Sequence, residues 1–294
     1  MKACAFVPGH VTGFFEIHDE AKDIRQRGSR GAGICLSKGA NTTVEVSESE
    51  KQSIEILINQ KKADSKVTEF VVKKILGDEP FQVKVSSVLD LPQSQGFGMS
   101  GAGALSSSMA LVEALGLEYS KNEIVCIAHW AEIMCGTGLG DVMPQSVGGM
   151  VIRKKEGCPP FGVLEDLDTV DEKVVLCVIG DELSTKDIIT HTGYRKKINE
   201  YGNECLQQLI KKPGLNKMMY LSLAFSRGTG LLSPELEEAI SAARKFGLAS
   251  MSMLGNSIFA IGETDNLESE LKNFGDVFVC NIDRKGMRII RGKE

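Results

Sequence analysis

The sequence predicts an α+β protein, and three observations favour that class. Several segments alternate between apolar and polar residues, as half-buried strands do, and others repeat apolar residues at helical spacing. A proline- and glycine-rich break, "EGCPPFG", divides the chain into two parts that each contain both kinds of segment. With 294 residues, 42% of them hydrophobic, the chain can bury one long core or two medium ones.

The first part begins with strands. We expect a strand over "ACAFV" that ends at the turn signal Pro8-Gly9-His10, followed by a loop rich in glycine and charge up to about Gly33. Alternation predicts two further strands, "TTVEVS" and "IEILI". Val67, Val71 and Ile75 then recur at helical spacing in "DSKVTEFVVKKIL", and "FQVKVSSVL" is a further strand.

Glycine-rich segments separate the elements that follow. The segment "ALSSSMALVEALG" predicts an apolar helix that ends at Gly116, and a second helix is expected from Asn122 to Met134. The loop "CGTGLGD" comes next, and "VGGMVIRKK" is typical of a returning strand.

The break at "EGCPPFG" predicts a domain boundary, with domains over 1–156 and 157–294. In the second domain we expect a strand over "KVVLCVIG", helices near 185–211, 214–226, 234–246 and 265–273, and a strand over "DVFVCNI". Ser184 or Thr185 is expected to cap the first of these helices.

Composition argues against several classes of protein. The net charge of −5 and the pI of about 5.6 disfavour nucleic-acid binding. No apolar run reaches the roughly 18 residues of a membrane helix, and the N-terminal apolar stretch is too short for a signal peptide. The eight cysteines are scattered and form no CxxC pair, so a cytoplasmic protein without structural zinc is expected.

The run "GFGMSG" matches the dinucleotide fingerprint G-x-G-x-x-G literally, but its surroundings do not. A loop containing Pro92 separates it from the preceding strand, and a second helix rather than a strand follows the first. Because glycines allow a close backbone approach and a helix begins nearby, the run is interpreted as a cradle for phosphate. The alternative is a helix rich in small residues that packs tightly against a neighbour.

Polar residues of the kinds that phosphoryl transfer needs surround the second glycine loop. His129 and Glu132 share one helix face, Asp141 follows the loop, and Arg153 lies in the next strand. A carboxylate and a hydroxyl such as Ser100 can hold magnesium, and a second carboxylate can face the attacking hydroxyl. Taken singly, each residue also has a plainer interpretation: Glu132 and Arg153 as solvated side chains, Asp141 as a turn residue and His129 as an interior side chain.

In combination, these segments resemble the GHMP kinase superfamily. Pro92 followed by "GFGMSGA" is similar to its second motif, which implies that Ser100 binds magnesium. The segment "GTGLGDVMPQSVGG" is similar to the superfamily's glycine-rich segment, in which an aspartate is followed by a strand that begins with Gly-Gly. This similarity implies that Asp141 is the catalytic aspartate and that Glu132 is the metal-binding glutamate. The first motif is present as "VPGH", so His10 stands where many relatives carry lysine. The third motif is reduced to "SMLGNS" around Gly255.

Within the superfamily, "FVPGHVTGFFEI", "GSRGAGICLSKG" and "AHWAEIMCGTGLGDVMPQSVGGMVIR" resemble the archaeal pantoate kinase family. The resemblance implies that the pantoate-binding residues are His10, Ser29, His129 and Arg153. It implies that ATP is bound by Gly96, Gly98, Ser100, Gly101, Ala102, Gly103 and Glu132, with Mg²⁺ on Ser100 and Glu132.

The implied fold is the two-domain GHMP kinase fold, with an N-terminal domain like the second domain of ribosomal protein S5 and a ferredoxin-like C-terminal domain. The implied activity is ATP-dependent phosphorylation of the primary hydroxyl of pantoate to 4-phosphopantoate in coenzyme A biosynthesis. The expected partner is this small molecule, with no nucleic acid or membrane, and a homodimer is expected. The alternatives are a GHMP-type kinase for another small alcohol (homoserine, shikimate or a mevalonate-like compound), a catalytically inactive relative and a nicotinamide enzyme.

Overall fold

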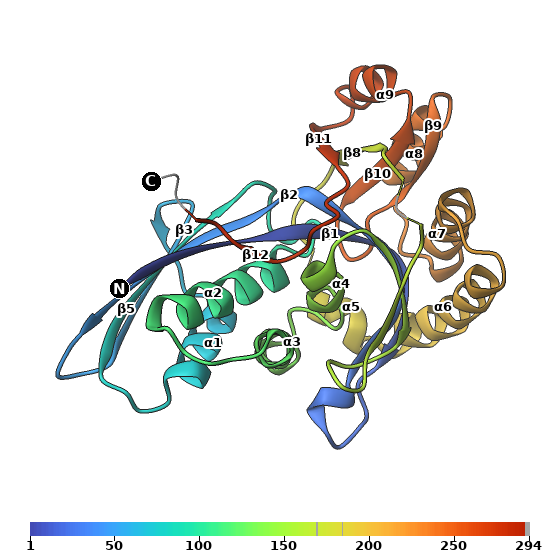
Figure 1. Ribbon diagram of the computed structural model, residues 1–294. Coiled ribbons are helices and arrows are strands. Elements are labelled where there is room, and N and C mark those ends of the chain that lie inside the picture. Colours follow the sequence, from blue (N-terminus) through green and yellow to red (C-terminus); the bar gives the residue numbers. More distant parts are fainter. Residues whose placement is uncertain (169, 184, 292–294) are drawn as a thin grey trace.

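The computed structural model describes residues 1–168, 170–183 and 185–291, and in these the chain forms an eight-stranded and a four-stranded sheet (Figure 1). The order in the larger sheet is β12-β1-β2-β5-β3-β4, and β6 pairs with both β2 and β7. Its strands are β1 (Lys2–His18), β2 (Gly28–Glu48), β3 (Ser53–Ile58), β4 (Lys61–Lys62), β5 (Phe81–Leu89), β6 (Met150–Lys155), β7 (Val163–Asp166) and β12 (Arg288–Ile289). All pairs except β3 with β5 are antiparallel.

Strand β1 does not end at the predicted turn. It continues through Pro8-Gly9-His10 to His18, and β2 begins at Gly28, so the loop predicted up to Gly33 is wrong. The register with β2 shifts between Pro8 and Gly9, and again between Thr12 and Phe14. Such bulges absorb irregular residues while the antiparallel ladder continues, which is why a turn signal did not end the strand.

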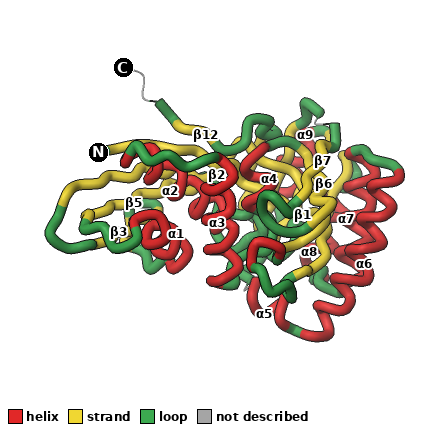
Figure 2. Tube along the Cα trace, turned by 60° about the horizontal axis from the view of Figure 1, so that its bottom comes forward, coloured by secondary structure: helices red, strands yellow, loops and turns green. Residues whose placement is uncertain are grey.

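Three helices cover one face of the larger sheet: α1 (Lys66–Leu76), α2 (Met99–Leu115) and α3 (Lys121–Cys135), as Figure 2 shows. Ser65 caps α1, and Ser120 caps α3 with a reciprocal bond from the Ser120 N–H to the Glu123 carboxylate. Helix α2 begins inside the glycine run, earlier than predicted, and ends at the expected Gly116. The short helix α4 (Val142–Val147), which follows the second glycine loop, was not predicted.

The four-stranded sheet has the order β11-β8-β10-β9 and is antiparallel throughout. Its strands are β8 (Lys173–Val178), β9 (Gly247–Met251), β10 (Ser257–Gly262) and β11 (Asp276–Asn281). The helices of this half are α5 (Thr185–Thr190), α6 (Thr192–Lys211), α7 (Leu215–Thr229), α8 (Pro234–Ala243) and α9 (Thr264–Leu271).

The helix predicted over 185–211 is interrupted. It forms α5 and α6, which are separated at His191, and the His191 side chain accepts the Tyr194 N–H as the cap of α6. The cap predicted at Ser184 lies outside the described residues, as does the side chain of Thr185. The aromatic ring of Phe225 on α7 packs against Phe14 and Phe15 of β1, with centroids 6.4 and 5.8 Å apart, and joins the two halves.

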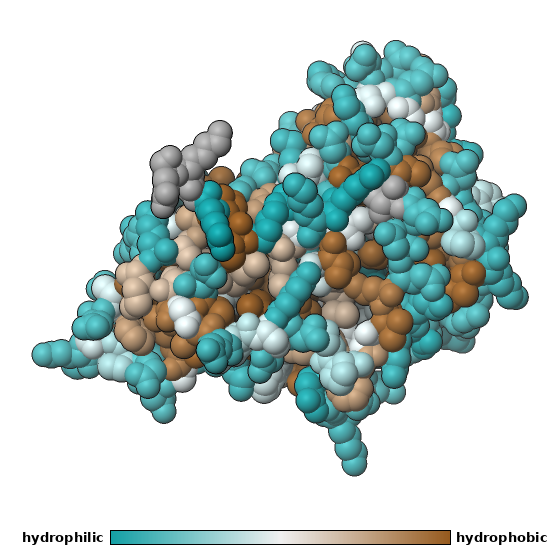
Figure 3. Space-filling model, viewed as in Figure 1, coloured by the Kyte–Doolittle hydropathy of each residue, from teal (hydrophilic) through white to brown (hydrophobic). Residues whose placement is uncertain are grey.

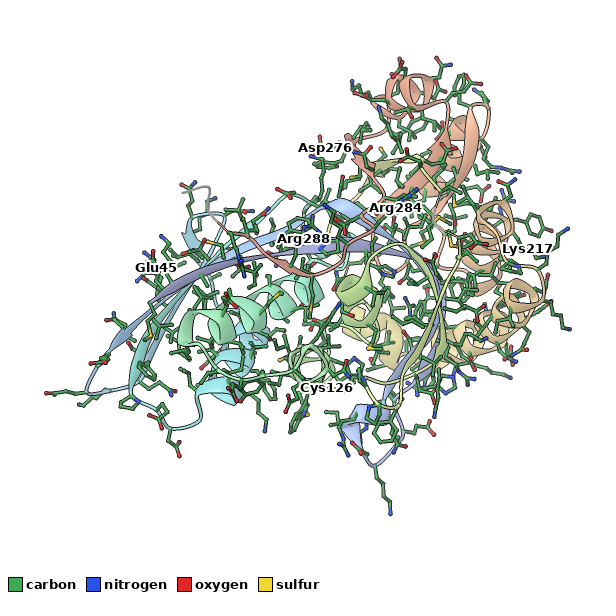
Figure 4. The ribbon with its side chains drawn as sticks, in the orientation of Figure 1. Glu45, Cys126, Lys217, Asp276, Arg284 and Arg288 are labelled. Carbon is green, nitrogen blue, oxygen red and sulfur yellow. The ribbon has the colours of Figure 1, made fainter. Side chains whose placement is uncertain are left out.

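Segments from the second half return to the larger sheet. Strand β7 pairs with β6, and β12 pairs with β1 through Ala5 and Phe6. Arg288, labelled beside β12 in Figure 4, lies 4.2 Å above the Phe6 ring and forms an ion pair of 2.8 Å with Asp283. The division between residues 156 and 157 therefore stays a prediction, because both sheets draw on residues after it.

Hydrophilic side chains form most of the visible rim of the molecule, and hydrophobic ones gather toward the middle of that face (Figure 3). The largest fully buried side chains include four phenylalanines, Phe14, Phe97, Phe225 and Phe259. Among the described residues, no helix combines the length and the apolar character that crossing a membrane requires.

Candidate active site

A cavity of about 570 Å³ lies where the two halves meet. Its walls come from β1, β2 and β6, the N-terminal ends of α1 and α2, the second glycine loop and the segment between β9 and β10. In Figure 1 the N-terminal end of α2 points toward the centre of the molecule, near α4. Seven residues predicted for the site line the cavity: Ser29, Gly96, Gly98, Ser100, Glu132, Asp141 and Arg153.

The first glycine run forms a tight entry to α2. Gly96 and Gly98 have φ angles of 75° and 64°, in the left-handed region that favours glycine. Gly98 occupies the N-cap position and, within the described part of the chain, offers the helix no side-chain cap. The first N–H groups of a helix have no partner inside the helix, so this end of α2 suits an anion in the cavity.

The next three residues of the run lie deeper. Gly101, Ala102 and Gly103 belong to the first turns of α2 and are not among the residues that line the cavity. A Cβ at Gly101 would lie 2.8 Å from Oε1 of Gln145 and 3.3 Å from Oε2 of Glu132. The structure therefore places Gly101 where Glu132 approaches α2 closely, and the predicted ATP contacts of these three residues stay predictions.

Glu132 is buried, and two hydroxyls donate to one of its oxygens. Ser100 Oγ and Thr137 Oγ1 each lie 2.6 Å from Glu132 Oε1. Burial raises the pKa of Glu132 to about 7, although both hydrogen bonds favour the charged form. The carboxyl group therefore titrates near neutral pH, and a cation placed beside it would stabilise its ionised form. Sequence analysis missed Thr137, which lies inside the glycine loop "GTGLG".

Asp141 faces the cavity and is held from β1. Its Oδ1 lies 2.8 Å from Nδ1 of the buried His10 and 3.2 Å from the hydroxyl of Thr12. Burial opposes ionisation of the carboxyl group. The hydrogen bond with His10, the charge of Arg153 and the hydrogen bond from Thr12 outweigh that effect and hold the pKa of Asp141 below its usual value. Asp141 is therefore ionised at neutral pH.

His10 does not line the cavity, and its side chain contacts Asp141 from behind. Burial lowers its pKa, with Asp141 opposing the shift. We therefore take His10 as neutral, with its Nδ1–H donated to Asp141. Its predicted contact with substrate stays a prediction, and the contact that the structure shows is with the carboxylate.

Arg153, Ser29 and Gly140 form a small cradle in the cavity wall. Arg153 is buried, and its Nε–H has no hydrogen-bond partner among the described residues. A Cβ at Gly140 would lie 2.2 Å from Ser29 Oγ and 3.2 Å from Arg153 Nε. Because Gly140 has no side chain, the Ser29 hydroxyl and the Arg153 Nε–H can both approach this point of the loop, and a carboxylate requires donors that converge in this way.

His129 lies beside this cradle and outside the cavity lining. Burial lowers its pKa, so the ring is neutral, and Nε2 lies 2.8 Å from the carbonyl oxygen of Arg27. The ring thereby holds the residues just before Ser29. Whether pantoate also touches His129 stays a prediction.

The reduced third motif contacts the first glycine run. A Cβ at Gly255 would lie 2.0 Å from the carbonyl carbon of Gln95, and Ser257 Oγ donates to the Gln95 carbonyl at 2.6 Å. Met253 and Leu254 line the cavity, but Gly255 does not. This motif therefore packs against the backbone that leads into the cradle.

Comparison with known proteins agrees with this architecture. The model of the GHMP kinases N-terminal domain matches residues 65–149, and the model of the GHMP kinases C-terminal domain matches residues 206–277. A pantoate kinase of Methanocaldococcus jannaschii is 40% identical over 281 residues, which cover 94% of this chain and 99% of that protein. The chain belongs to the pantoate kinase family of GHMP kinases.

Further members of the pantoate kinase family and a solved structure are similar over nearly the whole chain. A pantoate kinase of Thermococcus kodakarensis is 34% identical over 283 residues, 93% of this chain and 92% of that protein. A structure described as a phosphotransferase related to the coenzyme A biosynthesis pathway superposes with a TM-score of 0.90 at 30% identity, and covers 99% of both chains. The predicted two-domain GHMP fold and the predicted family are confirmed.

Proposed function

We propose that this protein transfers the γ-phosphoryl group of ATP to the primary hydroxyl of pantoate and forms 4-phosphopantoate, a step in coenzyme A biosynthesis. Membership in the pantoate kinase family supports the reaction class. The observation that supports pantoate as the acceptor is the cradle around Gly140. It presents the Ser29 hydroxyl and the Arg153 Nε–H, which has no partner among the described residues, to a small carboxylate next to Asp141.

The acceptor carboxylate is proposed to bind at Arg153 and Ser29. The buried, unpaired Nε–H of Arg153 would gain the partner that it lacks in the described structure. Ser29 Oγ, whose close approach to the loop depends on the glycine at position 140, would donate a second hydrogen bond. The neutral His129 ring would keep Ser29 in place through Arg27.

Asp141 is proposed to orient the primary hydroxyl and to accept its proton as the new P–O bond forms. The low pKa of Asp141 keeps it ionised, so it can accept a hydrogen bond from the hydroxyl in the ground state. Phosphoryl transfer depends mainly on positioning and electrostatics, and here the rigid contacts of Asp141 with His10 and Thr12 supply the positioning.

The nucleotide phosphates are proposed to lie on the glycine run at the start of α2, where Gly96 and Gly98 line the cavity. Mg²⁺ would be held by Glu132 and Ser100, and when bound it offsets phosphate charge. Among the described residues, no group of three or more His, Cys, Asp or Glu side chains could hold a metal ion. A Mg²⁺ site of one carboxylate, hydroxyls and substrate phosphates fits this set, because Mg²⁺ commonly binds that way.

The test is ADP release from Mg-ATP with a panel of pantoate, homoserine, mevalonate, shikimate and pantothenate as acceptors. We expect turnover on pantoate, with 4-phosphopantoate identified by phosphorus NMR. Turnover on a different alcohol would replace the acceptor and keep the ATP site. No turnover with any acceptor, while ATP still binds, would instead indicate an inactive relative.

A further inference from the structure

Thr12 connects the two charged groups of the acceptor site. Its hydroxyl oxygen lies 3.4 Å from both Nη1 and Nη2 of Arg153 and 3.2 Å from Oδ1 of Asp141. The side chain lines the cavity. One hydroxyl therefore stands between the guanidinium proposed to bind the acceptor carboxylate and the carboxylate proposed to orient the acceptor hydroxyl.

These contacts use the one proton and both lone pairs of the hydroxyl, and Nδ1 of His10 also lies 3.4 Å from the same oxygen. A threonine hydroxyl has one proton to donate and two lone pairs to accept with. Arg153 can only donate, so its two N–H groups take the lone pairs, and the proton goes to the ionised Asp141. The direction of every bond is thereby fixed, and the group cannot rotate without losing one of them.

His10 engages the same oxygen of Asp141. Both the His10 Nδ1–H and the Thr12 hydroxyl point to Oδ1. Oδ2 is thus the oxygen left to accept a hydrogen bond from a ligand in the cavity. The two donors together fix which oxygen faces the acceptor.

The backbone places Thr12 at this point independently of its hydroxyl. The ladder between β1 and β2 shifts register between Thr12 and Phe14, and a bulge of this kind re-aims the side chains next to it. The carbonyl of Thr12 accepts the N–H of Met253 at 3.0 Å, within ordinary hydrogen-bond range, and Met253 belongs to the other half of the chain. Loss of the hydroxyl alone should therefore leave the strand in place.

We propose that Thr12 is a positioning and specificity-determining residue, which fixes the spacing between the carboxylate-binding Arg153 and the hydroxyl-orienting Asp141. This inference rests on the proposed function and extends it. The single-hydroxyl link selects short hydroxy acids, in which the carboxylate and the reacting hydroxyl are a few bonds apart. A longer acid can satisfy Arg153 or Asp141, but it cannot satisfy both in the attacking geometry.

The experiment compares Thr12→Val, which keeps the shape of the side chain and removes the hydroxyl, with Thr12→Ser, which keeps the hydroxyl. Three acceptors are assayed with saturating Mg-ATP: pantoate, a hydroxy acid one carbon longer, and 2,2-dimethylpropane-1,3-diol, which lacks the carboxylate. Thermal unfolding of each variant checks that the protein is folded. The KM for ATP serves as an internal reference.

We expect Thr12→Val to raise the KM for pantoate and to lower kcat, each by about 10-fold, as loss of a hydrogen bond to a charged group does. Its preference for pantoate over the longer acid should fall by about 10-fold, while the KM for ATP changes less than about twofold. Thr12→Ser should restore the wild-type preference. The Thr12→Val substitution should lower turnover of the diol less than turnover of pantoate, because the diol has no carboxylate for Arg153.

Two results would overturn the proposal. One is a Thr12→Val protein with the wild-type preference among the acids. The other is an equal loss on all three acceptors that Thr12→Ser does not restore, which would indicate a general structural role. If the wild-type protein phosphorylates a different hydroxy acid, the variants are compared on that acid, so that the acceptor and the role of Thr12 are judged separately. If the wild type turns over nothing, calorimetric binding of pantoate to wild type and Thr12→Val decides, and equal affinities count against the proposal.

Discussion

The imidazole Nδ1 of His10 lies 2.8 Å from Oδ1 of Asp141, although 131 positions separate the two residues in the chain. The His10 side chain is fully buried, whereas that of Asp141 is 28% exposed to the cavity. A neutral donor behind an ionised carboxylate fixes its orientation without neutralising its charge. This arrangement differs from that of a lysine at the same position, which would bring a full positive charge.

Replacement of Asp141 by Asn should abolish most of the kinase activity. Asn keeps the shape and an oxygen for the His10 donor, but it carries no charge and accepts protons poorly. We expect kcat to fall by about 10²- to 10⁴-fold, the usual contribution of a general base. Steady-state ADP release measures the effect, and unchanged thermal unfolding shows that the fold is intact. Activity near the wild-type value would exclude both the base and the electrostatic role.

Substitutions of His10 separate its hydrogen bond from its volume. In His10→Asn an amide N–H can replace Nδ1–H, whereas His10→Leu has a similar size and no donor. We expect Leu to lower kcat at least about 10-fold more than Asn does, because Asp141 loses its buried donor. The KM for pantoate should change little in either variant. A large rise in that KM with kcat preserved would instead support direct contact between His10 and substrate.

Glu132 should make the stability of the metal-free protein depend on pH. Its pKa is about 7 in the folded state against an ordinary value of 4.5, so folding takes up a proton between these values. The stabilisation is complete below pH 4.5 and is lost as the pH rises through about 7. From pH 5 to pH 8, the unfolding free energy of wild type should fall relative to Glu132→Gln by on the order of 2 kcal/mol.

Urea titrations at pH 5, 6, 7 and 8 without metal measure this difference, and parallel curves for the two proteins would contradict it. The comparison with Glu132→Gln is needed because His10 and His129 act in the opposite direction. Their pKa values are lowered from 6.5, so both proteins lose stability as the pH falls below that value. Affinity for Mg²⁺ should rise with pH in wild type only, because the metal binds the ionised carboxylate.

His129 offers a test of positioning against direct substrate contact. In His129→Gln the amide N–H can still reach the Arg27 carbonyl, and in His129→Leu it cannot. We expect His129→Leu to raise the KM for pantoate by about 10-fold, because the segment before Ser29 loses its anchor. His129→Gln should stay within about threefold of wild type. An equal rise of the KM for pantoate in both variants would favour a direct contact of the imidazole with pantoate.

Gly140→Ala should close the carboxylate cradle. The added Cβ would lie 2.2 Å from Ser29 Oγ, so the hydroxyl must move from its place beside residue 140. We expect the KM for pantoate to rise by about 10- to 100-fold, which corresponds to one or two lost hydrogen bonds. The KM for ATP should be preserved, since the nucleotide is proposed to bind on the other glycine run. A wild-type KM for pantoate would place the acceptor carboxylate elsewhere.

Elements with strong periodicity could be predicted from the sequence. Helices α1 and α3 and the strand β5 occur where apolar spacing placed them, because each buries one face against the core, whereas α2, which is buried on most sides, begins earlier than predicted. The strand end predicted from the turn signal Pro8-Gly9 was wrong, because a bulge in the long, buried pairing of β1 with β2 accommodates those residues. The division of residues 185–211 into α5 and α6 depends on the His191 cap, a residue type that carries little capping signal.

Site residues with unusual chemistry could also be predicted, whereas their ordinary partners could not. Two glycine-rich segments, together with the Asp, Glu and Arg residues in or near them, indicated the phosphate, metal and acceptor positions. Thr12 and Thr137 carry no such signal, because isolated threonines are common in strands and loops. The signal for Thr12 was the period of two from His10, which places both on one strand face, but it was hidden by the predicted end of that strand.

The pairing of β12 with β1 has a consequence for synthesis of the protein. Strand β1 is translated before β12, and about 280 residues separate Ala5 and Phe6 from their partners Ile289 and Arg288. Until then that side of β1 is an open strand edge, on which another nascent chain can add a strand. Arrival of Arg288 and Ile289 covers this edge, so synthesis of β12 is also the step that protects this part of the sheet from aggregation.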